Sequence, residues 1–584
     1  MSEGYGTGCS QTDSIAVDCT WSENQLRAAA TELYTPIKKW QTRILRLHRG
    51  TSDEVPRADL LKAGLANDDS LVIGMDEEKV TYCAVSYAWG KWSPAVPIMC
   101  NGVNYRVNPS LAGALKRFRH EDRDRYLWAD ALCINQFDVS EKSSQVRNMF
   151  NIFRKAEAVL VWLGGATPNA TLALQEVHAS STKGSATVPS DKLVAGMQDL
   201  CSRPWLSRAW IQQEVFAARD LVLHCGMHSF TLDDYKAMGR RLEGIIGIQI
   251  DTTNADERPV QYDLQALAAL KRGGVDELCE LDQSRSQVHR LYMGSESLGS
   301  GRVRNENVAQ DLRRNVALFE DVLGRGRFLG ASDPRDLVYA LLGLTNCSAA
   351  VESSPGLRSV DTLTLPIDYS KTPSEVFQDV TKYIVKRDGN LSILLNHRPA
   401  SHGRLQEPLP SWTIDWTVPN YRYIRGAGGR RGDFDLQEGG ILGTVVLCGI
   451  VIATIVTITP MQDQCFEREG WLLRLLRYAK AFWEAEEVLY EPNGEEVVAR
   501  SYREYLHLLR PVDFAVLVDG AKHPIFLRPH DNGRFSFVCM GDHGFEKMYL
   551  EGMPSSWASK ELTRLSISRI CESGRDYRRA FTVI

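Results

Sequence analysis

The sequence of 584 residues lacks the cysteine patterns that mark disulfide frameworks and structural zinc sites. Its 13 cysteines include no CxxC pair and no Cys/His array at zinc spacing. We therefore expect no bound metal and no disulfide framework, and most of these thiols should be small buried hydrophobic groups. Cysteine usage of this kind indicates a reducing, cytoplasmic location.

The sequence also lacks an excess of positive charge and the glycine-rich motifs of nucleotide-binding proteins. Its formal net charge is -5 and its pI is about 6.2, so no cationic face for nucleic acid is indicated. There is no GxGxxG after a strand and no GxxxxGK[ST] loop, so neither a dinucleotide redox cofactor nor a P-loop is expected.

No targeting signal and no membrane-spanning helix is expected. The start, MSEGYGTG, has neither a basic and apolar leader nor the Met-Gly of a myristoylation site. One uncharged stretch, Ile441 to Thr459, is nearly long enough to cross a bilayer. It is rich in Val, Ile and Thr and interrupted by Gly443 and Gly449, which favours two buried strands around a bend, with a transmembrane helix as the alternative.

What is present from Val80 onward is an alternation of strand and helix patterns. VTYCAVSYA, YLWADALCI and AVLVWLGG read as apolar strands, and NPSLAGALKRFRH and EKSSQVRNMFNIFRKA as amphipathic helices between them. Such alternation predicts a parallel sheet with crossover helices. Before it, Leu45 and Leu47 alternate with Arg46 and His48, which predicts a short edge strand.

Composition shifts divide the chain into four parts. The runs FAVLVDG, HPIFLRP and FSFVCMG alternate apolar and polar residues between turn residues, which predicts a small antiparallel β-domain at the carboxyl end. We expect a flexible amino-terminal tail over residues 1–34 and an α/β domain over residues 35–220, with core motifs at 80–217. A mainly helical region should follow over residues 221–400, and a β-rich domain over residues 401–584.

Three blocks in one order carry a family resemblance: YCAVSYAWG from Tyr82, LWADALCINQ from Leu127 and RPWLSRAWIQQEV from Arg203. Together they resemble the heterokaryon incompatibility (HET) domain of filamentous fungi. The resemblance continues through SDPRDLVYALLGL, PIDYSKTPSEVFQDV, LPSWTIDWT and AVLVDGAKHPIFLRP, and so covers most of the chain from about Thr35.

The resemblance implies a role in non-self recognition between fused fungal cells, with growth arrest or cell death as the outcome. The HET domain is also distantly similar to the TIR domain, some of whose members cleave NAD. In those enzymes a glutamate follows a tryptophan as W-x-x-x-E, and Trp210 and Glu214 match that pattern. The resemblance thus implies a TIR-like or flavodoxin-like parallel sheet, with NAD as a substrate and no resident cofactor.

The ends of the predicted strands bring candidate binding residues together. In an open parallel sheet, ligands settle where the strands end. Ser86, Tyr87 and Trp89 lie near the exit of the first strand and Asp130 near that of the second, so we expect them to border one crevice. Trp89 would stack on a planar ring, and Asp130 would bind ribose. The alternatives are that Trp89 packs in the core, that Ser86 is satisfied inside the sheet, and that Asp130 caps a helix.

Glu214 is the candidate catalytic residue, with Trp210 as a substrate-binding neighbour four residues earlier on the same helix face. When NAD is cleaved, the cationic nicotinamide ring leaves as a neutral molecule, so no acid has to protonate it. One carboxylate that stabilises the oxocarbenium-like ribose would therefore suffice for catalysis. The alternative is a structural ion pair between Glu214 and Arg203 or Arg208.

The remaining polar residues of the central block are expected to be structural. Asn135 and Gln136 should hold the CINQ loop through backbone hydrogen bonds, and Cys133 should be buried rather than nucleophilic. Glu141 and Gln145 should face solvent or the crevice, with Glu141 compensating a helix dipole.

Three functions remain open on the sequence alone. The first is an NAD-cleaving effector whose toxicity is switched on by assembly. The second is a non-enzymatic signalling module that acts by self-association or through another incompatibility protein. The third is a HET-fold protein recruited to the tailoring of a secondary metabolite.

Overall fold

The computed structural model describes residues 23–237, apart from 66–70, 74–77, 91–94 and 184–190, together with parts of the chain from 323 to 583. Those parts are residues 323, 329–343, 365–388, 391, 393–394, 405, 407–418, 437–438, 445–463, 468–477, 496–501, 509–518, 525–540 and 579–583. The chain divides into two compact units, Met1–His289 and Arg290–Ile584.

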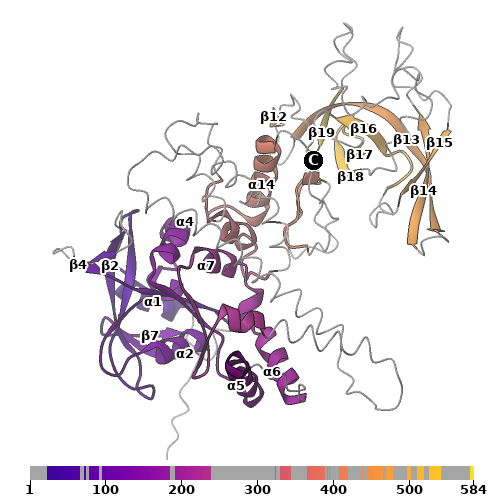
Figure 1. The fold of residues 1–584 in the computed structure, drawn as a ribbon. Helices are drawn as coiled ribbons and strands as arrows, with labels where there is room; N and C mark the ends of the chain where they lie inside the picture. Colours follow the sequence, from indigo (N-terminus) through magenta and orange to yellow (C-terminus); the bar gives the residue numbers. More distant parts are fainter. Residues whose placement is uncertain are drawn as a thin grey trace, which may run out of the picture. The chain divides into compact units, whose positions relative to one another are not determined.

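The N-terminal unit is built on an 11-stranded sheet (Figure 1). Its strands lie in the order β11-β10-β9-β5-β8-β1-β2-β3-β4, and the hairpin β6-β7 is attached to β2. The strands are β1 Gln41–Leu47, β2 Arg57–Leu65, β3 Leu71–Ile73, β4 Glu78–Val80, β5 Cys83–Tyr87, β6 Val96–Cys100, β7 Val103–Val107, β8 Arg125–Trp128, β9 Ala158–Trp162, β10 Leu221–Cys225 and β11 His228–Thr231.

The predicted alternation of strands and helices is confirmed, and four strands at the centre run parallel. β10 pairs with β9, β9 with β5 and β5 with β8, all in parallel register. The whole sheet is mixed, however, because β1 runs antiparallel to β8 and β11 antiparallel to β10. The fold of this unit is therefore α/β with a parallel core and antiparallel flanks.

The prediction of an edge strand around Leu45 and Leu47 was wrong. β1 is internal, with β8 on one side and β2 on the other. The alternation was misleading because the charged residue Arg43 in the same strand is buried rather than exposed to solvent.

Helices cover both faces of the parallel core. Phe118 of α2 packs edge-on against Trp162 of β9, and Phe153 of α4 packs edge-on against Trp128 of β8. Trp162 is in register with Tyr87, and Trp128 with Ala84, so the two tryptophans lie on opposite faces because side chains alternate along β5. The helices are α1 Glu23–Leu33, α2 Pro109–Phe118, α3 Asp130–Cys133, α4 Val139–Lys155, α5 Pro168–Lys183, α6 Asp191–Cys201, the 3₁₀ turn η1 Pro204–Ser207 and α7 Ile211–Ala217.

Helix α2 begins as its sequence predicts. Asn108 is the N-cap, and its side-chain oxygen accepts a hydrogen bond of 2.8 Å from the amide of Leu111. Pro109 takes the first helical position, where no amide donor is needed. This cap fixes the start of the helix that covers one face of β5.

Two elements lie where the sequence led us to expect other structure. Helix α1 lies within residues 1–34, for which we expected a flexible tail, and it buries Ala29, Ala30 and Leu33 on one side. Strands β10 and β11 lie beyond residue 220, where we expected the α/β domain to end, and they extend its sheet.

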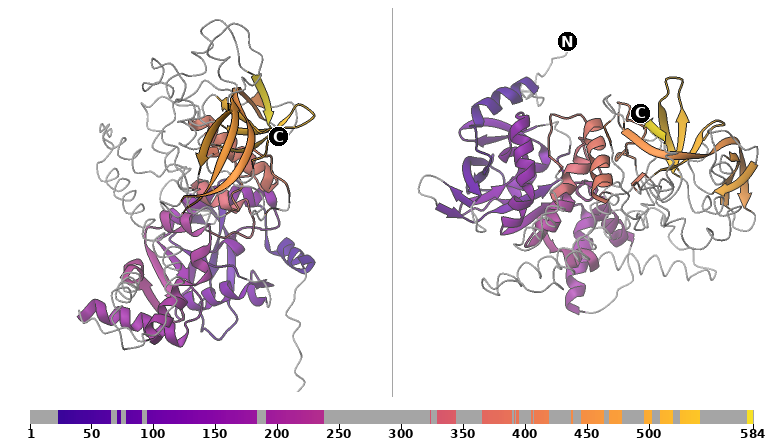
Figure 2. Two further views of the ribbon diagram at one scale, coloured as in Figure 1. Left: turned by 90° about the vertical axis from the view of Figure 1, so that its right-hand side faces the viewer. Right: turned by 90° about the horizontal axis from the view of Figure 1, so that it is seen from above.

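The C-terminal unit contains the small antiparallel sheet that the sequence predicts. FAVLVDG, HPIFLRP and FSFVCMG contain β16 Phe514–Val518, β17 Ile525–Pro529 and β18 Phe535–Met540, which pair antiparallel in that order. Figure 2 shows these strands in orange and yellow. The other elements are helix α14 Pro373–Asp388 and strands β12 Gln437–Glu438, β13 Val445–Asp463, β14 Arg468–Arg477, β15 Glu496–Ser501 and β19 Arg579–Val583.

The apolar stretch from Ile441 to Thr459 forms most of one long strand, β13, and not two strands around a bend. Register shifts at Val451/Ala453 and Ile455/Thr457 let the strand curve, and its partners change from β19 and β16 at one end to β14 at the other. Among the helices that the structure describes, none combines the length and hydrophobicity needed to cross a bilayer.

An arginine joins two of the sequence blocks in the C-terminal unit. Arg335 donates to the carbonyls of Tyr369 and Lys371 at 2.6 and 2.7 Å. Its guanidinium also pairs with Asp333 at 2.7 Å and lies over the Tyr369 ring. The SDPRD segment and the PIDYSK segment are therefore held together by one side chain.

Candidate active site

The candidate site is at the exit of β5, which, like β9, has parallel partners on both sides. Ser86 and Tyr87 are its last two residues, and both are buried. Because they are adjacent in a strand, their side chains leave on opposite faces of the sheet. Gly90 follows in a left-handed conformation, with φ of 64°, which favours glycine at this turn.

Ser86 joins α7 to η1 on one of these faces. Its hydroxyl donates a short hydrogen bond to Oε2 of Glu214 and accepts one of 2.7 Å from Nε1 of Trp205. Glu214 is 2% exposed and Trp205 is 0% exposed. Ser86 and Glu214, which the sequence offered as separate candidates, thus belong to one fully buried network.

Glu214 lies where its ionised form is disfavoured. Burial raises the pKa of its carboxyl above the ordinary value, although the positive charge of Arg208 and the Ser86 hydrogen bond act in the opposite direction. The negative charge of Asp130 adds to the rise in pKa, which places that carboxylate within electrostatic reach. Nη1 of Arg208 lies 3.6 Å from Oε1 of Glu214, as in the structural alternative, whereas Arg203 pairs with Asp199 instead.

A second group of hydrogen bonds centres on Asp130. Its Oδ1 accepts from the Tyr87 hydroxyl at 2.9 Å, and its Oδ2 accepts from Nε1 of Trp89 at 2.8 Å. Burial and the negative charge of Asp130 raise the pKa of Tyr87 well above its ordinary value, so Tyr87 remains a hydrogen-bond donor. Oδ1 also accepts from the amide of Ala131, so Asp130 both organises the start of α3 and holds the half-buried Trp89.

The structure brings together four of the five predicted site residues: Ser86, Trp89, Asp130 and Glu214. Trp210 is the N-cap of α7, and its carbonyl accepts from the amide of Glu214 at 3.1 Å. Within the described part of the chain, its half-buried indole forms no hydrogen bond or ring contact. No role in binding substrate follows from these contacts for Trp210.

Sequence reasoning missed Trp205 as a member of the site, and it placed Tyr87 at the strand exit without a hydrogen-bond partner. Trp205 lies 119 residues from Ser86 in the chain, so no spacing could indicate their pairing. Tyr87 follows Ser86 directly, and its position at the strand exit was the one signal available.

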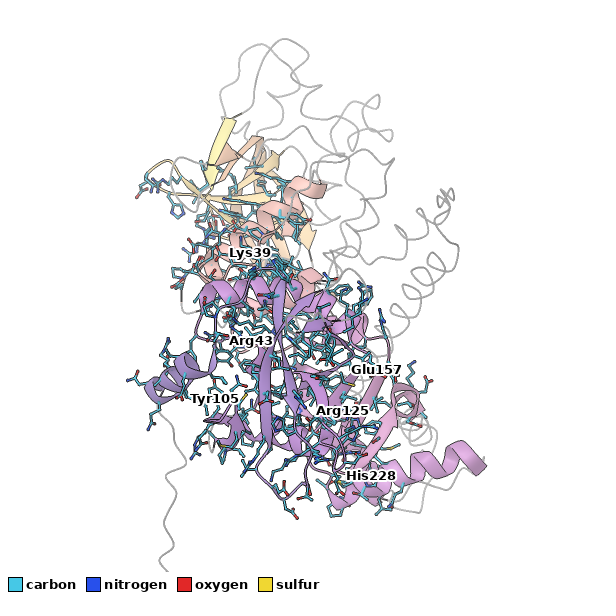
Figure 3. The ribbon with its side chains drawn as sticks, turned by 90° about the vertical axis from the view of Figure 1, so that its left-hand side faces the viewer. Lys39, Arg43, Tyr105, Arg125, Glu157 and His228 are labelled. Atoms are coloured by element: carbon cyan, nitrogen blue, oxygen red, sulfur yellow. The ribbon has the colours of Figure 1, made fainter. Side chains whose placement is uncertain are left out.

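A neighbouring ion pair corrects the prediction for Glu141 and Gln145. Both are largely buried: Glu141 makes a bidentate pair of 2.6 and 2.9 Å with Arg43, and Gln145 donates to the carbonyl of Gln41. Arg43, labelled in Figure 3, has a side chain that is only 2% exposed, so its charge requires a carboxylate partner. The acidic residue at the start of α4 is therefore a partner for β1 rather than a solvent-facing group.

The CINQ loop is held as predicted. Gln136 donates to the carbonyl of Asp130 at 3.0 Å, and the side-chain oxygen of Asn135 accepts from the amide of Phe137. Cys133 is buried, and burial raises the pKa of its thiol to about 12, which confirms a structural rather than a nucleophilic thiol. Trp128 is likewise in the core, with its N–H donated to Thr42.

Comparison with known proteins supports the resemblance expected from the sequence. A family model described as Heterokaryon incompatibility protein (HET) matches residues 82–214. The chain is also 25% identical over 405 residues to heterokaryon incompatibility protein 6, OR allele, of Neurospora crassa. That match covers 58% of this chain and 53% of the relative, so the chain spans about half the length of that protein. No solved structure gives a significant match.

Proposed function

We propose, from the premise that residues 82–214 carry a HET domain, that this protein acts in fungal incompatibility and cell death by cleaving NAD at Glu214. The observation that carries the proposal is the Glu214 carboxylate hydrogen-bonded to Ser86 at the exit of the central parallel strand. A buried carboxylate with a raised pKa at the end of a parallel strand is typical of a functional site.

The topology of the parallel core supports a TIR-like or flavodoxin-like fold. Numbered by their order along the chain, β8, β5, β9 and β10 lie side by side as second, first, third and fourth parallel strands. Doubly wound sheets with that order bind ligands between the first and third strands, where the direction of winding reverses. Here those strands are β5 and β9, and Ser86 and Glu214 lie at that position.

The chemistry needs little from the protein beyond one anionic group. The bond between ribose C1′ and the nicotinamide nitrogen breaks, and its electron pair neutralises the pyridinium. Water then forms a bond to C1′ and loses a proton to solvent, which gives nicotinamide, ADP-ribose and H⁺. Glu214 in its ionised form would stabilise the positive charge that develops on ribose, as carboxylates do in glycoside hydrolysis. Asp130, held by Tyr87 and Trp89, would bind ribose hydroxyls.

The burial of Glu214 fits a resting state. Its carboxylate is 2% exposed, so NAD reaches it only after side chains at the strand exit move. Trp89 and Asp130 are half-buried at the same strand exit, and in this proposal they are the side chains that move. In this proposal, assembly with a second copy or with another incompatibility protein drives that movement.

The proposal is tested by the NAD content of fungal cells that express the chain under an inducible promoter. We expect NAD to fall before viability does, and Glu214→Gln at matched protein levels to abolish both losses. Asp124→Asn is the matched control because Asp124 is a partly exposed carboxylate paired with Arg46, outside the site. Death with NAD intact would contradict NAD cleavage.

The same burial favours a second candidate function, a non-enzymatic module that signals by self-association. Glu214 already has a hydrogen bond from Ser86 and a positive neighbour in Arg208, as a structural carboxylate would. This candidate predicts that a folded Glu214→Gln protein kills as the wild type does.

A further inference from the structure

Two arginines flank the turn η1, and within the described residues only Arg203 is held by hydrogen bonds from its side chain, although its Nε is unpaired. Arg203, before the turn, donates to the carbonyls of Leu163 and Gly165 at 3.1 and 3.0 Å and to Asp199 at 2.8 Å. Arg208, after the turn, makes no side-chain hydrogen bond to the described residues, and its buried Nη1 is without a hydrogen-bond partner. Its one ionic neighbour is Glu214, at 3.6 Å.

Such a guanidinium is unusual in this molecule. The side chain of Arg208 is only 15% exposed, and an arginine that is largely desolvated normally has its donors paired. Arg43 and Arg335, which are buried or half-buried, each donate four hydrogen bonds from the side chain. Arg43 and Arg203 each leave their Nε unpaired, but Arg208 differs from them in making no side-chain hydrogen bond at all to the described residues.

The backbone of Arg208 is hydrogen-bonded, whereas its side chain makes no hydrogen bond to the described residues. Its amide donates to the carbonyl of Trp205 at 3.2 Å, and Trp205 is anchored in the core by Ser86. The guanidinium is close enough to both Glu214 and Tyr87 for its charge to lower their pKa values. Its charge is thus within electrostatic reach of Glu214 in one group and of Tyr87 in the other.

We propose that Arg208 is the anion-binding residue of this site and that it binds the diphosphate of the dinucleotide substrate. This inference rests on the proposed cleavage of NAD. The planar guanidinium matches phosphate oxygens in a bidentate geometry, which an ammonium does not reproduce. A diphosphate on Arg208 would place the attached ribose next to Glu214 and Asp130, the carboxylates proposed to act on it.

The test is the affinity of the full-length protein for ADP-ribose and for inorganic diphosphate, measured by titration calorimetry in a Glu214→Gln background that cannot cleave NAD. We expect Arg208→Gln to weaken the binding of both ligands about ten- to hundredfold, which is the contribution of one hydrogen bond to a charged group. Arg208→Lys should recover part of that loss in affinity. Arg219→Gln, at an exposed arginine just after α7, is the control and should leave both affinities unchanged.

Nicotinamide riboside, which carries no phosphate, separates recognition from folding. Its affinity should change less than about twofold in Arg208→Gln, because the lost contact is to phosphate alone. The proposal is overturned if protein with Arg208 unaltered binds neither ADP-ribose nor diphosphate, or if Arg208→Gln binds both as tightly. It is also overturned if Arg208→Gln weakens the binding of the riboside as much as that of ADP-ribose. Failure of the proposed cleavage would look different: assembled protein with Glu214 unaltered would leave NAD intact while ADP-ribose still bound through Arg208.

Discussion

Replacing Ser86 by alanine should destabilise the N-terminal unit, because one hydroxyl satisfies two buried groups. The N–H of Trp205, which is 0% exposed, would lose its acceptor, and the carboxyl of Glu214 would lose its donor. A buried polar group left unpaired costs about 1–3 kcal/mol, and more if it is charged. The free energy of local unfolding around β5 should therefore decrease by about 2–5 kcal/mol. This range is less than the full sum of the two losses because neighbouring effects are not fully additive.

The assay is hydrogen exchange of the β5 amides, which reports the local free energy without assuming that both units unfold together. Ser86→Cys is the matched variant: it keeps the shape of the side chain but donates and accepts weakly, so its loss should be intermediate. A decrease below about 1 kcal/mol in Ser86→Ala would refute the claim that this hydroxyl holds the network together.

Three further predictions concern stability. Glu141→Ala leaves the buried guanidinium of Arg43 without its carboxylate, so urea unfolding should show a loss of about 3–5 kcal/mol, and a loss under about 1 kcal/mol would contradict the pairing. Burial raises the pKa of Glu214, so the folded protein holds this proton to higher pH than the unfolded chain and loses stability as pH rises above the ordinary value of 4.5. Glu214→Gln should therefore become more stable relative to wild type as the pH rises above about 4.5, and a relative stability that is independent of pH would refute this sign. Arg335→Ala should release the segment around Tyr369, seen as faster proteolysis there, and an unchanged cleavage pattern would be the contrary result.

The parts of the fold that follow from local patterns could be predicted from the sequence. The apolar run at 83–87 and the Asn108-Pro109 helix start need only near neighbours to be recognised, and both are present as β5 and α2. The candidate site was predictable to the same extent. Ser86 and Asp130 were expected at strand exits, and the structure links each to the site that this placement indicated.

What could not be predicted depends on contacts between distant residues. The alternation around Leu45 indicated an exposed edge, but β1 pairs with β2 and β8, and Glu141, 98 residues after Arg43, provides the partner that lets the charge of Arg43 be buried there. The acceptor for the Trp205 N–H, the Ser86 hydroxyl, could not be predicted either. A hydrogen bond between residues 119 positions apart has no signature in spacing or periodicity. Charge and apolar patterns show which residues prefer burial, and the fold decides which of them meet.

The most direct test of the central claim is the fate of NAD with purified full-length protein, assembled by cross-linking or crowding. Nicotinamide and ADP-ribose would be followed by chromatography alongside Glu214→Gln protein of equal folded content. The account predicts that both products appear in equal amounts with the wild type and that neither appears with the variant. NAD that stays intact with the assembled wild type, or cleavage that continues unchanged in Glu214→Gln, would contradict it.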